Sequence, residues 1–218
     1  MQPGLLPLFP LEVVLMPGGH LPLHIFEERY KEMIGEARRD HSEFGIVLAS
    51  REGLAETGCT ATIEGVLQEY PDGRLDIVTL GRRRFEILLV NEERSFLRGA
   101  VEFFDDEPGE EPVDTAVRET AISGYNALQT LWNNPALEDA GSTDPQVSFR
   151  LARAVRDLPF RQALLKSRSE AERIARLAAY LPDLAAKLKR EQEVKTSAHS
   201  TSGPSNGHAP YLNGNGRH

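Results

Sequence analysis

The sequence of 218 residues holds a single cysteine, Cys59, and no long apolar run. One cysteine excludes an intramolecular disulfide and a zinc site built on several cysteines, and it fits a reducing compartment. No apolar run approaches the roughly 20 residues that span a bilayer, and residues 1–9 lack the basic start and continuous apolar core of a signal peptide. We therefore expect a cytoplasmic protein with no membrane partner.

The sequence is also poor in lysine, and the signatures of common catalytic sites are missing. None of the five lysines follows a glycine, so a GxxxxGK[ST] loop for nucleotide phosphates is excluded. The Ser-x-x-Lys, GxSxG and HExxH patterns are absent as well. Spacing alone leaves open a dyad assembled from distant residues, but the sequence predicts no enzyme, no catalytic residue and no cofactor.

The formal net charge of −8 is unevenly distributed. Residues 102–114 contain seven acids and no base, whereas residues 145–195 contain twelve bases and six acids. Such charge runs usually mark solvated linkers and solvated helix faces. The alternative is that the basic second half binds an anionic partner. The densest basic run, Arg82 to Arg84, lies within residues 1–105, which carry eleven bases against eighteen acids, so nucleic-acid binding is disfavoured.

Short strands dominate the first half, because proline and glycine repeatedly interrupt its apolar runs. One helix is predicted at residues 27–39, where apolar residues recur at helical spacing. A tight turn is predicted at Pro71-Asp72-Gly73, which makes the flanking runs a hairpin. The predicted strands are residues 5–9, 13–16, 21–25, 44–49, 61–70, 75–80, 84–90 and 96–104. They indicate a small barrel-like or mixed β domain.

The second half changes to helical periodicity after an acidic, proline-broken segment at residues 105–114. Helices are predicted at residues 113–131, at 145–158 with Asp144 as N-cap, and at 160–166. Ser169 and Glu172 form a capping box for a last helix, which Pro182 kinks or divides and which fades near Glu193. The predicted domains are a β-rich part (1–105), a helical bundle (106–195) and a disordered tail (196–218).

Histidine does not predict a metal site. His20 and His24 are four residues apart, but Pro22 between them favours an extended segment, so they do not share a helix face. Glu27 and Arg29 either form a charged rim for ligand recognition or, more commonly for such a pair, cap a helix and pair with each other. We take His24, Glu27 and Arg29, near the expected barrel rim, as candidate substrate contacts, and we expect no metal ligand.

Several spaced motifs resemble one known family. Leu6-Pro7-Leu8-Phe9-Pro10-Leu11, Val14-Leu15-Met16-Pro17-Gly18 and Leu21-Pro22-Leu23-His24-Ile25-Phe26-Glu27-Glu28-Arg29-Tyr30 resemble the opening of the LON substrate-binding domain, the N-terminal domain of Lon proteases. Gly58-Cys59-Thr60-Ala61, Gly81-Arg82-Arg83-Arg84-Phe85-Glu86-Ile87 and Leu158-Pro159-Phe160-Arg161-Gln162-Ala163-Leu164-Leu165 are similar to its later segments. The resemblance covers about residues 5–189. It implies an α+β fold, in which a PUA-like pseudo β-barrel precedes a C-terminal helical bundle.

The resemblance also implies a function. The ATPase and protease domains of Lon would follow the bundle, where this chain ends, so we expect a stand-alone, non-catalytic member. Our leading hypothesis is a recognition protein that binds proteins or peptides, including non-native ones, as an adaptor in protein quality control. The alternatives are a small-molecule sensor with a pocket at the barrel rim and an RNA-binding PUA-like protein. The sequence leaves the client and the oligomeric state open.

Overall fold

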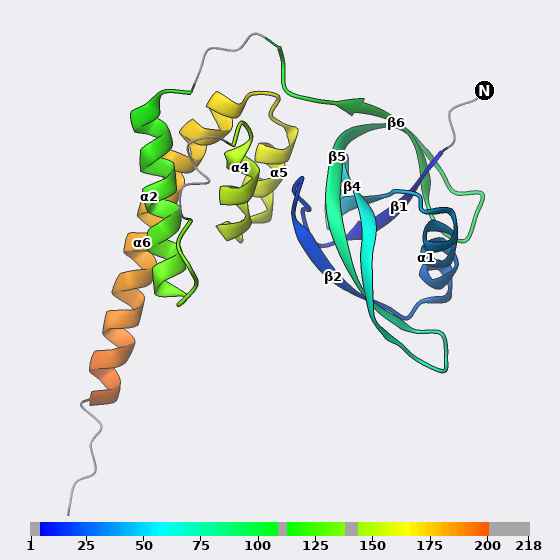
Figure 1. Cartoon of the computed structure of the whole chain (residues 1–218), viewed down its shortest axis with the longest axis horizontal. Helices are drawn as coiled ribbons and strands as arrows, with labels where there is room; N and C mark the ends of the chain where they lie inside the picture. Colours follow the sequence, from blue (N-terminus) through cyan, green and yellow to red (C-terminus); the bar gives the residue numbers. More distant parts are fainter. Residues whose placement is uncertain (1–4, 109–112, 138–143, 201–218) are drawn as a thin grey trace, which may run out of the picture.

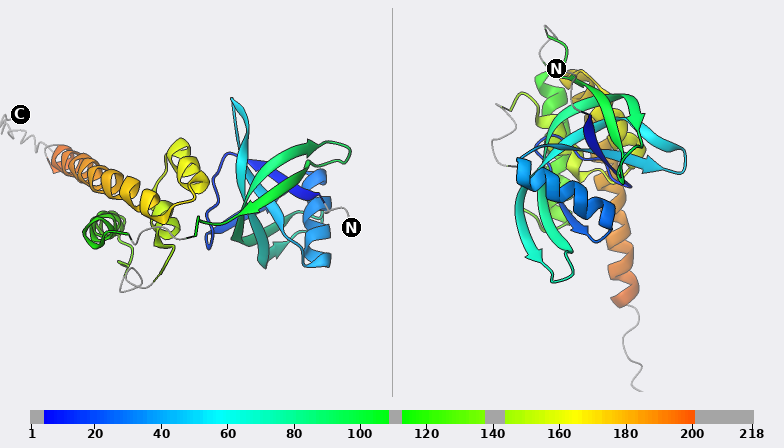
Figure 2. Two further views of the ribbon diagram at one scale, coloured as in Figure 1. Left: turned by 90° about the horizontal axis from the view of Figure 1, so that it is seen from above. Right: turned by 90° about the vertical axis from the view of Figure 1, so that its right-hand side faces the viewer.

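The computed structural model describes residues 5–108, 113–137 and 144–200, without the side chains of residues 196–200. A strand-rich part and a helical part lie end to end (Figures 1 and 2). Helix α1 lies at the far end of the strand-rich part, and the C-terminal half of α6 extends away from it (Figure 2). The α+β prediction, with strands first and helices after, is confirmed.

Six strands form one mixed sheet in the order β2-β5-β4-β3-β1-β6. An additional pairing between β5 and β6 closes five of them into a ring, the pseudo-barrel expected from the sequence. Strands β1 and β3 are parallel, and the other pairs are antiparallel. The strands are β1 (Leu6–Leu11), β2 (His20–Ile25), β3 (Phe44–Ser50), β4 (Gly53–Glu69), β5 (Leu75–Asn91) and β6 (Arg98–Phe104).

The predicted hairpin is present, but its strands are longer than expected. The turn at Tyr70 to Arg74 contains Gly73 at φ +81°, a conformation that glycine adopts without strain. Strand β5 runs through the predicted strands 75–80 and 84–90 without a break, and β4 begins well before residue 61. Bulges at several points along these ladders let two long strands bend around the barrel.

A small cluster of buried residues, Leu8, Val47 and Phe85, packs on one face of the closed strands. The Phe85 ring lies directly over two glycines. A Cβ at Gly45 or Gly58 would meet the Phe85 Cζ atom at 2.6 or 2.5 Å, so these two positions must be glycine for the ring to fit.

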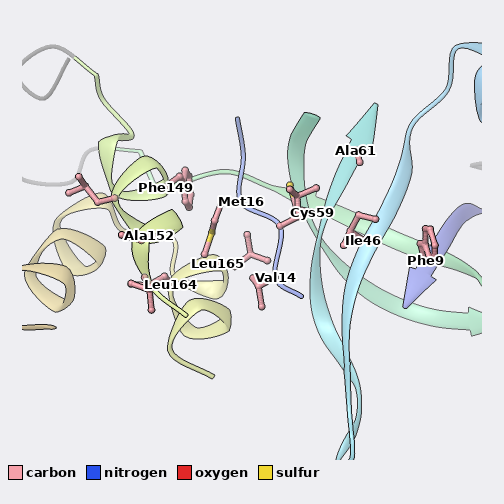
Figure 3. Packing of buried hydrophobic residues seen from close by; sticks show 14 of the residues in the cluster. Phe9, Val14, Met16, Ile46, Cys59, Ala61, Phe149, Ala152, Leu164 and Leu165 are labelled. Carbon is pink, nitrogen blue, oxygen red and sulfur yellow. The ribbon is translucent and has the colours of Figure 1, made fainter. Parts of the chain in front are cut away.

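The opposite face carries the larger core, which continues into the helical part. Helix α1 (Glu28–Asp40) buries Tyr30, Met33, Ile34 and Ala37 against it. The prediction of a strand at residues 13–16 is wrong, since this segment is irregular. Its Val14 and Met16 side chains are buried between the strands and the helices (Figure 3). The apolar run reflects burial at this junction, which periodicity cannot distinguish from a buried strand.

The helical part contains α2 (Thr115–Leu131), α4 (Val147–Leu151), α5 (Leu158–Lys166) and α6 (Glu170–Ser200), with a 3₁₀ turn η1 (Ala152–Ala154) after α4. The single helix predicted at 145–158 is therefore wrong. The predicted N-cap Asp144 instead accepts from the Gln146 amide in the turn before α4. Pro182 lies inside α6 without dividing it.

Helix α6 begins as predicted and ends later. The Ser169 hydroxyl accepts from the Glu172 amide, which is half of the expected capping box, but the Glu172 carboxylate accepts from Ser167 and Arg176 instead of completing it. The helix runs to Ser200, past the end expected near Glu193 and into the predicted tail, while residues 201–218 lie outside the described part. Among the described helices, none is long and apolar enough to cross a membrane.

Candidate functional site

The first candidate, His24, lies on the exposed face of β2 opposite Asp76 of β5. Its Nδ1 atom is 2.5 Å from the Asp76 Oδ1 atom, and the Tyr70 hydroxyl donates to Asp76 Oδ2 at 2.8 Å. These two hydrogen bonds, that of His24 first, lower the pKa of Asp76. The exposed Phe26 ring stacks on His24 with centroids 5.8 Å apart. His24 is thus exposed, and a carboxylate holds its ring in place.

The second and third candidates, Glu27 and Arg29, pair with each other. The Arg29 Nη2 atom is 2.8 Å from the Glu27 Oε2 atom, and the Arg29 guanidinium lies 4.5 Å from the centroid of the Tyr30 ring. Glu27 precedes α1 but makes no side-chain capping hydrogen bond. The structure therefore joins Glu27 with Arg29 and places His24 in a different set of contacts.

The basic run is divided among three environments, so it does not form a shared cationic patch. Arg82 donates to Thr62, and Arg83 pairs with Glu43 at 3.0 Å while its guanidinium lies over the Phe103 ring. Arg84 is buried and points toward the helical part. Because the three arginines do not lie together, the run from Arg82 to Arg84 gives no clustered positive charge for a nucleic-acid backbone.

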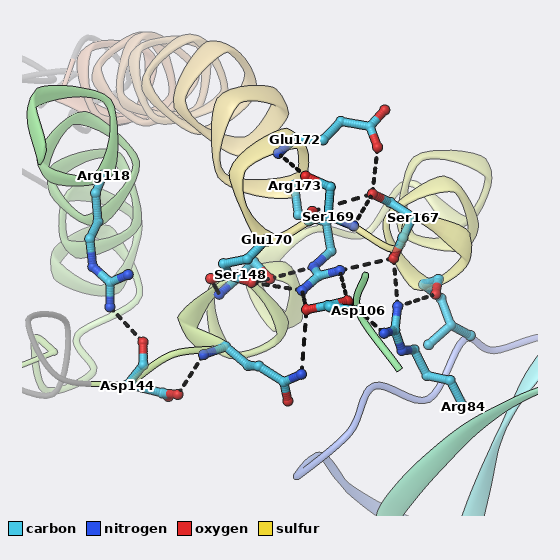
Figure 4. Close-up of polar contacts among 12 residues, drawn as sticks. Arg84, Asp106, Arg118, Asp144, Ser148, Ser167, Ser169, Glu170, Glu172 and Arg173 are labelled. Atoms are coloured by element: carbon cyan, nitrogen blue, oxygen red, sulfur yellow. Dashed lines mark hydrogen bonds and ion pairs between the residues drawn. The ribbon is translucent and has the colours of Figure 1, made fainter. Parts of the chain in front are cut away.

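Arg84 belongs to a buried ionic network at the junction of the two parts (Figure 4). Its Nη2 atom donates to Asp106 Oδ1 at 2.6 Å, and its Nη1 atom donates to the Ser167 carbonyl at 2.5 Å. Arg173 of α6 donates to both carboxylate oxygens of Asp106, at 2.7 and 2.6 Å. Burial opposes charge on Asp106, but the two arginines outweigh it and lower the pKa of this carboxyl.

Glu170 extends the network beneath α4. Its carboxylate accepts from the Ser148 amide at 3.0 Å, from the Ser148 hydroxyl at 2.5 Å and from Arg173 at 2.8 Å. Burial raises the pKa of Glu170 despite these contacts. The pKa of Arg173 is also raised: burial opposes its charge, and the Asp106 and Glu170 carboxylates more than offset that. The network fixes how the helical part sits on the barrel.

Beside this network, a cleft of about 750 Å³ lies between the β3–β4 hairpin and the start of α5. We call it the junction cleft. Apolar side chains and four charged ones line it: Glu12, Leu48, Ala49, Ser50, Arg51, Glu52, Gly53, Leu54, Ala55, Glu56, Leu158, Pro159 and Gln162. Three carboxylates against one guanidinium make its rim acidic. Its size falls within the range of ligand-binding clefts, and it presents strand backbone as well as side chains.

Two other hollows differ from the junction cleft in chemistry. A groove of about 900 Å³ between α2 and α6 is lined mainly by small side chains such as Ala127 and Ala185. A hollow of about 360 Å³ beside the end of α1 is lined by charged groups that include Arg38, Glu64 and Arg82. The groove has no strand in its lining, and the hollow beside α1, which does include β4 residues, has only about half the volume of the junction cleft. In the described residues, no group of three or more histidine, cysteine, aspartate or glutamate side chains is arranged to hold a metal ion.

Sequence reasoning missed the junction cleft. Residues 53–60 were not predicted as strand, because Gly53, Thr57, Gly58 and Thr60 break the apolar alternation that marks one. The motif from Leu158 to Leu165 carries part of the family resemblance and predicts a short helix, but it does not indicate a cleft. A signal was available in the Arg51-Glu52-Gly53 turn, which follows a buried apolar strand as hairpin turns do.

The model of the ATP-dependent protease La (LON) substrate-binding domain matches residues 5–194. Similar curated proteins include a Lon protease of Parabacteroides distasonis, 33% identical over 110 residues, which are 46% of this chain and 13% of that protein. Lon protease 1 of Hydrogenovibrio crunogenus is 28% identical over 99 residues, 42% of this chain and 12% of the protease. The matches therefore span only a small share of those proteases.

Solved structures agree with these matches. The chain is similar to the crystal structure of a Lon N-terminal domain protein from Xanthomonas campestris, with a TM-score of 0.65 and 25% identity over 82% of this chain and 99% of that one. It shares its fold with the N-terminal domain of a Mycobacterium avium complex Lon protease, with a TM-score of 0.59 and 18% identity over 83% of this chain and 99% of that one.

Proposed function

Because the chain belongs to the LON substrate-binding domain family, we propose that it recognises segments of other proteins and that it binds them in the junction cleft. The chain acts as a recognition protein without catalysis of its own, in the cytoplasm, and delivers or holds non-native polypeptides as an adaptor in protein quality control. The family match supports the recognition of substrates. The adaptor role is our extension of that recognition function.

The observation that carries the choice of site is the composition of the junction cleft. Leu54 and Ala55 of the hairpin face Leu158 and Pro159 of α5 across it, and all four are at least partly exposed. Non-native segments differ from folded surfaces in exposing apolar side chains and unpaired backbone. A cleft that offers both an apolar lining and strand backbone matches both features.

The Asp106 network supports this choice, since it holds the two walls of the cleft together. One wall belongs to the barrel and the other to the helical part, and Asp106 joins Arg84 of β5 to Arg173 of α6. Rigid walls reduce the entropy that binding must otherwise remove. The three residues first singled out, His24, Glu27 and Arg29, remain candidate contacts at the other end of the long β4–β5 hairpin.

The test is binding of a reduced, carboxymethylated globular protein, labelled with a fluorophore, to the full chain by fluorescence anisotropy. We expect saturable binding that the native form of the same protein does not show. Leu54→Asp is expected to weaken it by about tenfold or more, as for a charge placed at the centre of an apolar contact. The matched control is Leu88→Asp, at a leucine of β5 that is 65% exposed and outside the junction cleft.

Further controls separate misfolding and other ligands from loss of binding. Thermal unfolding shows whether Leu54→Asp still folds, and Pro159→Glu gives a second, exposed position in the cleft. If Leu88→Asp or His24→Ala weakens binding of the unfolded protein and the two cleft variants do not, the binding site lies outside the junction cleft. Binding that only RNA shows, and that falls steeply with salt, replaces the proposal with nucleic-acid recognition. No binding of either polymer favours the small-molecule sensor.

A further inference from the structure

Near its start, β4 has described neighbours on one side only: Gly53 and Leu54 pair with Ser50 and Ala49 of β3, while the described pairing with β5 begins at Thr57. The β4–β5 ladder begins at Thr57 opposite Glu86, and the β3–β4 ladder jumps from the pair Val47–Gly58 to the pair Ala49–Leu54. In the described chain, the two registers therefore give Ala55 and Glu56 no partner. After Glu86, the described pairing of β5 continues with β6 alone. The edge of residues 54–56 on the β5 side is therefore unpaired among the described strands, and an unpaired strand edge is a template on which another chain can pair.

One side chain of α5 reaches this gap. The Gln162 Nε2 atom donates to the Thr57 carbonyl at 2.8 Å, so backbone next to the gap faces α5 and the junction cleft. The Oε1 atom of the same amide is buried and has no hydrogen-bond partner among the described residues. Through its Nε2 donor, Gln162 ties α5 to β4 at the end of the unpaired edge.

The charged residues at the rim of the junction cleft determine which charge a bound segment should carry. Glu12, Glu52 and Glu56 stand against Arg51 alone, and the whole chain carries a net charge of −8. The lining between them is apolar, with Leu54, Ala55 and Leu158 partly exposed. An apolar segment flanked by lysine or arginine matches this surface in both respects.

We propose that the client binds by strand addition: an extended apolar segment with basic flanks pairs with the backbone of Leu54, Ala55 and Glu56 in the junction cleft. The inference rests on the proposed function, since it names the binding mode and the client class of the same site. Main-chain hydrogen bonds supply affinity without sequence preference. The paired stretch is short, about 10 Å for three residues.

The test uses the full chain and three labelled peptides of about ten residues with one apolar centre. The first has lysine flanks, the second has glutamate flanks, and the third has lysine flanks and N-methyl groups at alternate central positions. N-methylation removes backbone donors while keeping the side chains. We expect the first peptide to bind about tenfold or more tightly than each of the others at low salt. Glu56→Lys, at an exposed position, is expected to reduce the preference for lysine flanks severalfold.

Hydrogen exchange of the protein locates the contact. With the lysine-flanked peptide bound, the amides of Ala55 and Glu56 are expected to exchange at least about tenfold more slowly, while those of the Tyr70-to-Arg74 turn do not change. Equal binding of the N-methylated peptide, or protection elsewhere, overturns strand addition but leaves the proposed function standing if the unfolded protein still binds. If neither the peptides nor the unfolded protein bind, both proposals fail.

Discussion

Asp106 and Arg173 form a bidentate ion pair: Nη1 of Arg173 donates to Oδ1 of Asp106 at 2.7 Å, and Nη2 donates to Oδ2 at 2.6 Å. Arg173 is fully buried, and Asp106 also accepts from Arg84. One carboxylate thus serves two buried cations that come from opposite parts of the molecule. Such planar pairs fix orientation as well as distance. Asp106 therefore links the barrel to α6 through one carboxylate.

Asp106→Asn is expected to lower the free energy of unfolding by about 3 kcal/mol, because it leaves Arg84 and Arg173 buried with too little counter-charge. Urea denaturation measures the change. The matched control is Asp105→Asn, at the exposed neighbour, where we expect a change within about 0.5 kcal/mol. Equal small effects of both substitutions would show that Glu170 alone neutralises the network.

The two glutamates near the start of α6 should respond to pH in opposite directions. Burial raises the pKa of Glu170, so its contribution to stability is present below its ordinary pKa and is lost as the pH rises through the raised value. The hydrogen bond from Ser167 is the first cause that lowers the pKa of Glu172, so its contribution is present at neutral pH and is lost on acidification.

Urea denaturation between pH 7 and about pH 4 compares the wild type with Glu170→Gln and with Glu172→Gln. In each difference, the contributions of the other carboxylates to the pH dependence cancel. As the pH falls, the stability of the wild type relative to Glu170→Gln should rise, and its stability relative to Glu172→Gln should fall. Parallel curves for both pairs would contradict the opposite pKa shifts.

The buried thiol of Cys59 should be chemically silent in the folded state. Burial raises its pKa to about 12, and the reactive form of cysteine is the thiolate. We expect a disulfide reagent at pH 8 to modify Cys59 only at the rate of unfolding, so labelling follows the urea transition. In a Cys59→Ala background, Leu88→Cys at a 65% exposed position should react at once. Complete labelling of native Cys59 within the same time would contradict its burial.

The fold could be predicted from local signals wherever these are strong. Pro71-Asp72-Gly73 marked the central hairpin, and the helical spacing of Tyr30, Met33, Ile34 and Ala37 marked α1. Residues 13–16 could not be predicted correctly, since an apolar run reports burial and not its cause. The closure of the barrel by β5 and β6 depends on long-range pairing, which periodicity does not encode.

The candidate site was harder to predict, because clefts and ionic networks combine residues distant in sequence. The acidic run at residues 102–114 predicts a solvated linker, yet its member Asp106 lies at the centre of a network with Arg84 and Arg173. Arg82, Arg83 and Arg84 are adjacent in the sequence, but Arg84 is buried whereas Arg82 and Arg83 are exposed. A single sequence gives side-chain chemistry, whereas the direction of each side chain follows from bulges and register.

The packing of Phe85 over Gly58 leads to a last prediction, in which two substitutions compensate each other. A Cβ at Gly58 would lie 2.5 Å from Phe85 Cζ and 2.7 Å from the Ile46 carbonyl oxygen, so Gly58→Ala should cost about 3 kcal/mol by overpacking. Phe85→Leu removes the ring tip and alone leaves a cavity that also destabilises. In urea denaturation, the double variant should lose less unfolding free energy than the sum of the two single losses, by about 1 kcal/mol or more, since the leucine vacates the space that the new methyl group fills.

Gly35→Ala is the control for this last prediction. Gly35 lies on the exposed side of α1 with no atom within 4 Å of the position that a Cβ would take, so the substitution should stabilise the protein by up to about 1 kcal/mol. Additive costs for Gly58→Ala and Phe85→Leu would show that the carbonyl of Ile46, and not the ring, limits the space at Gly58.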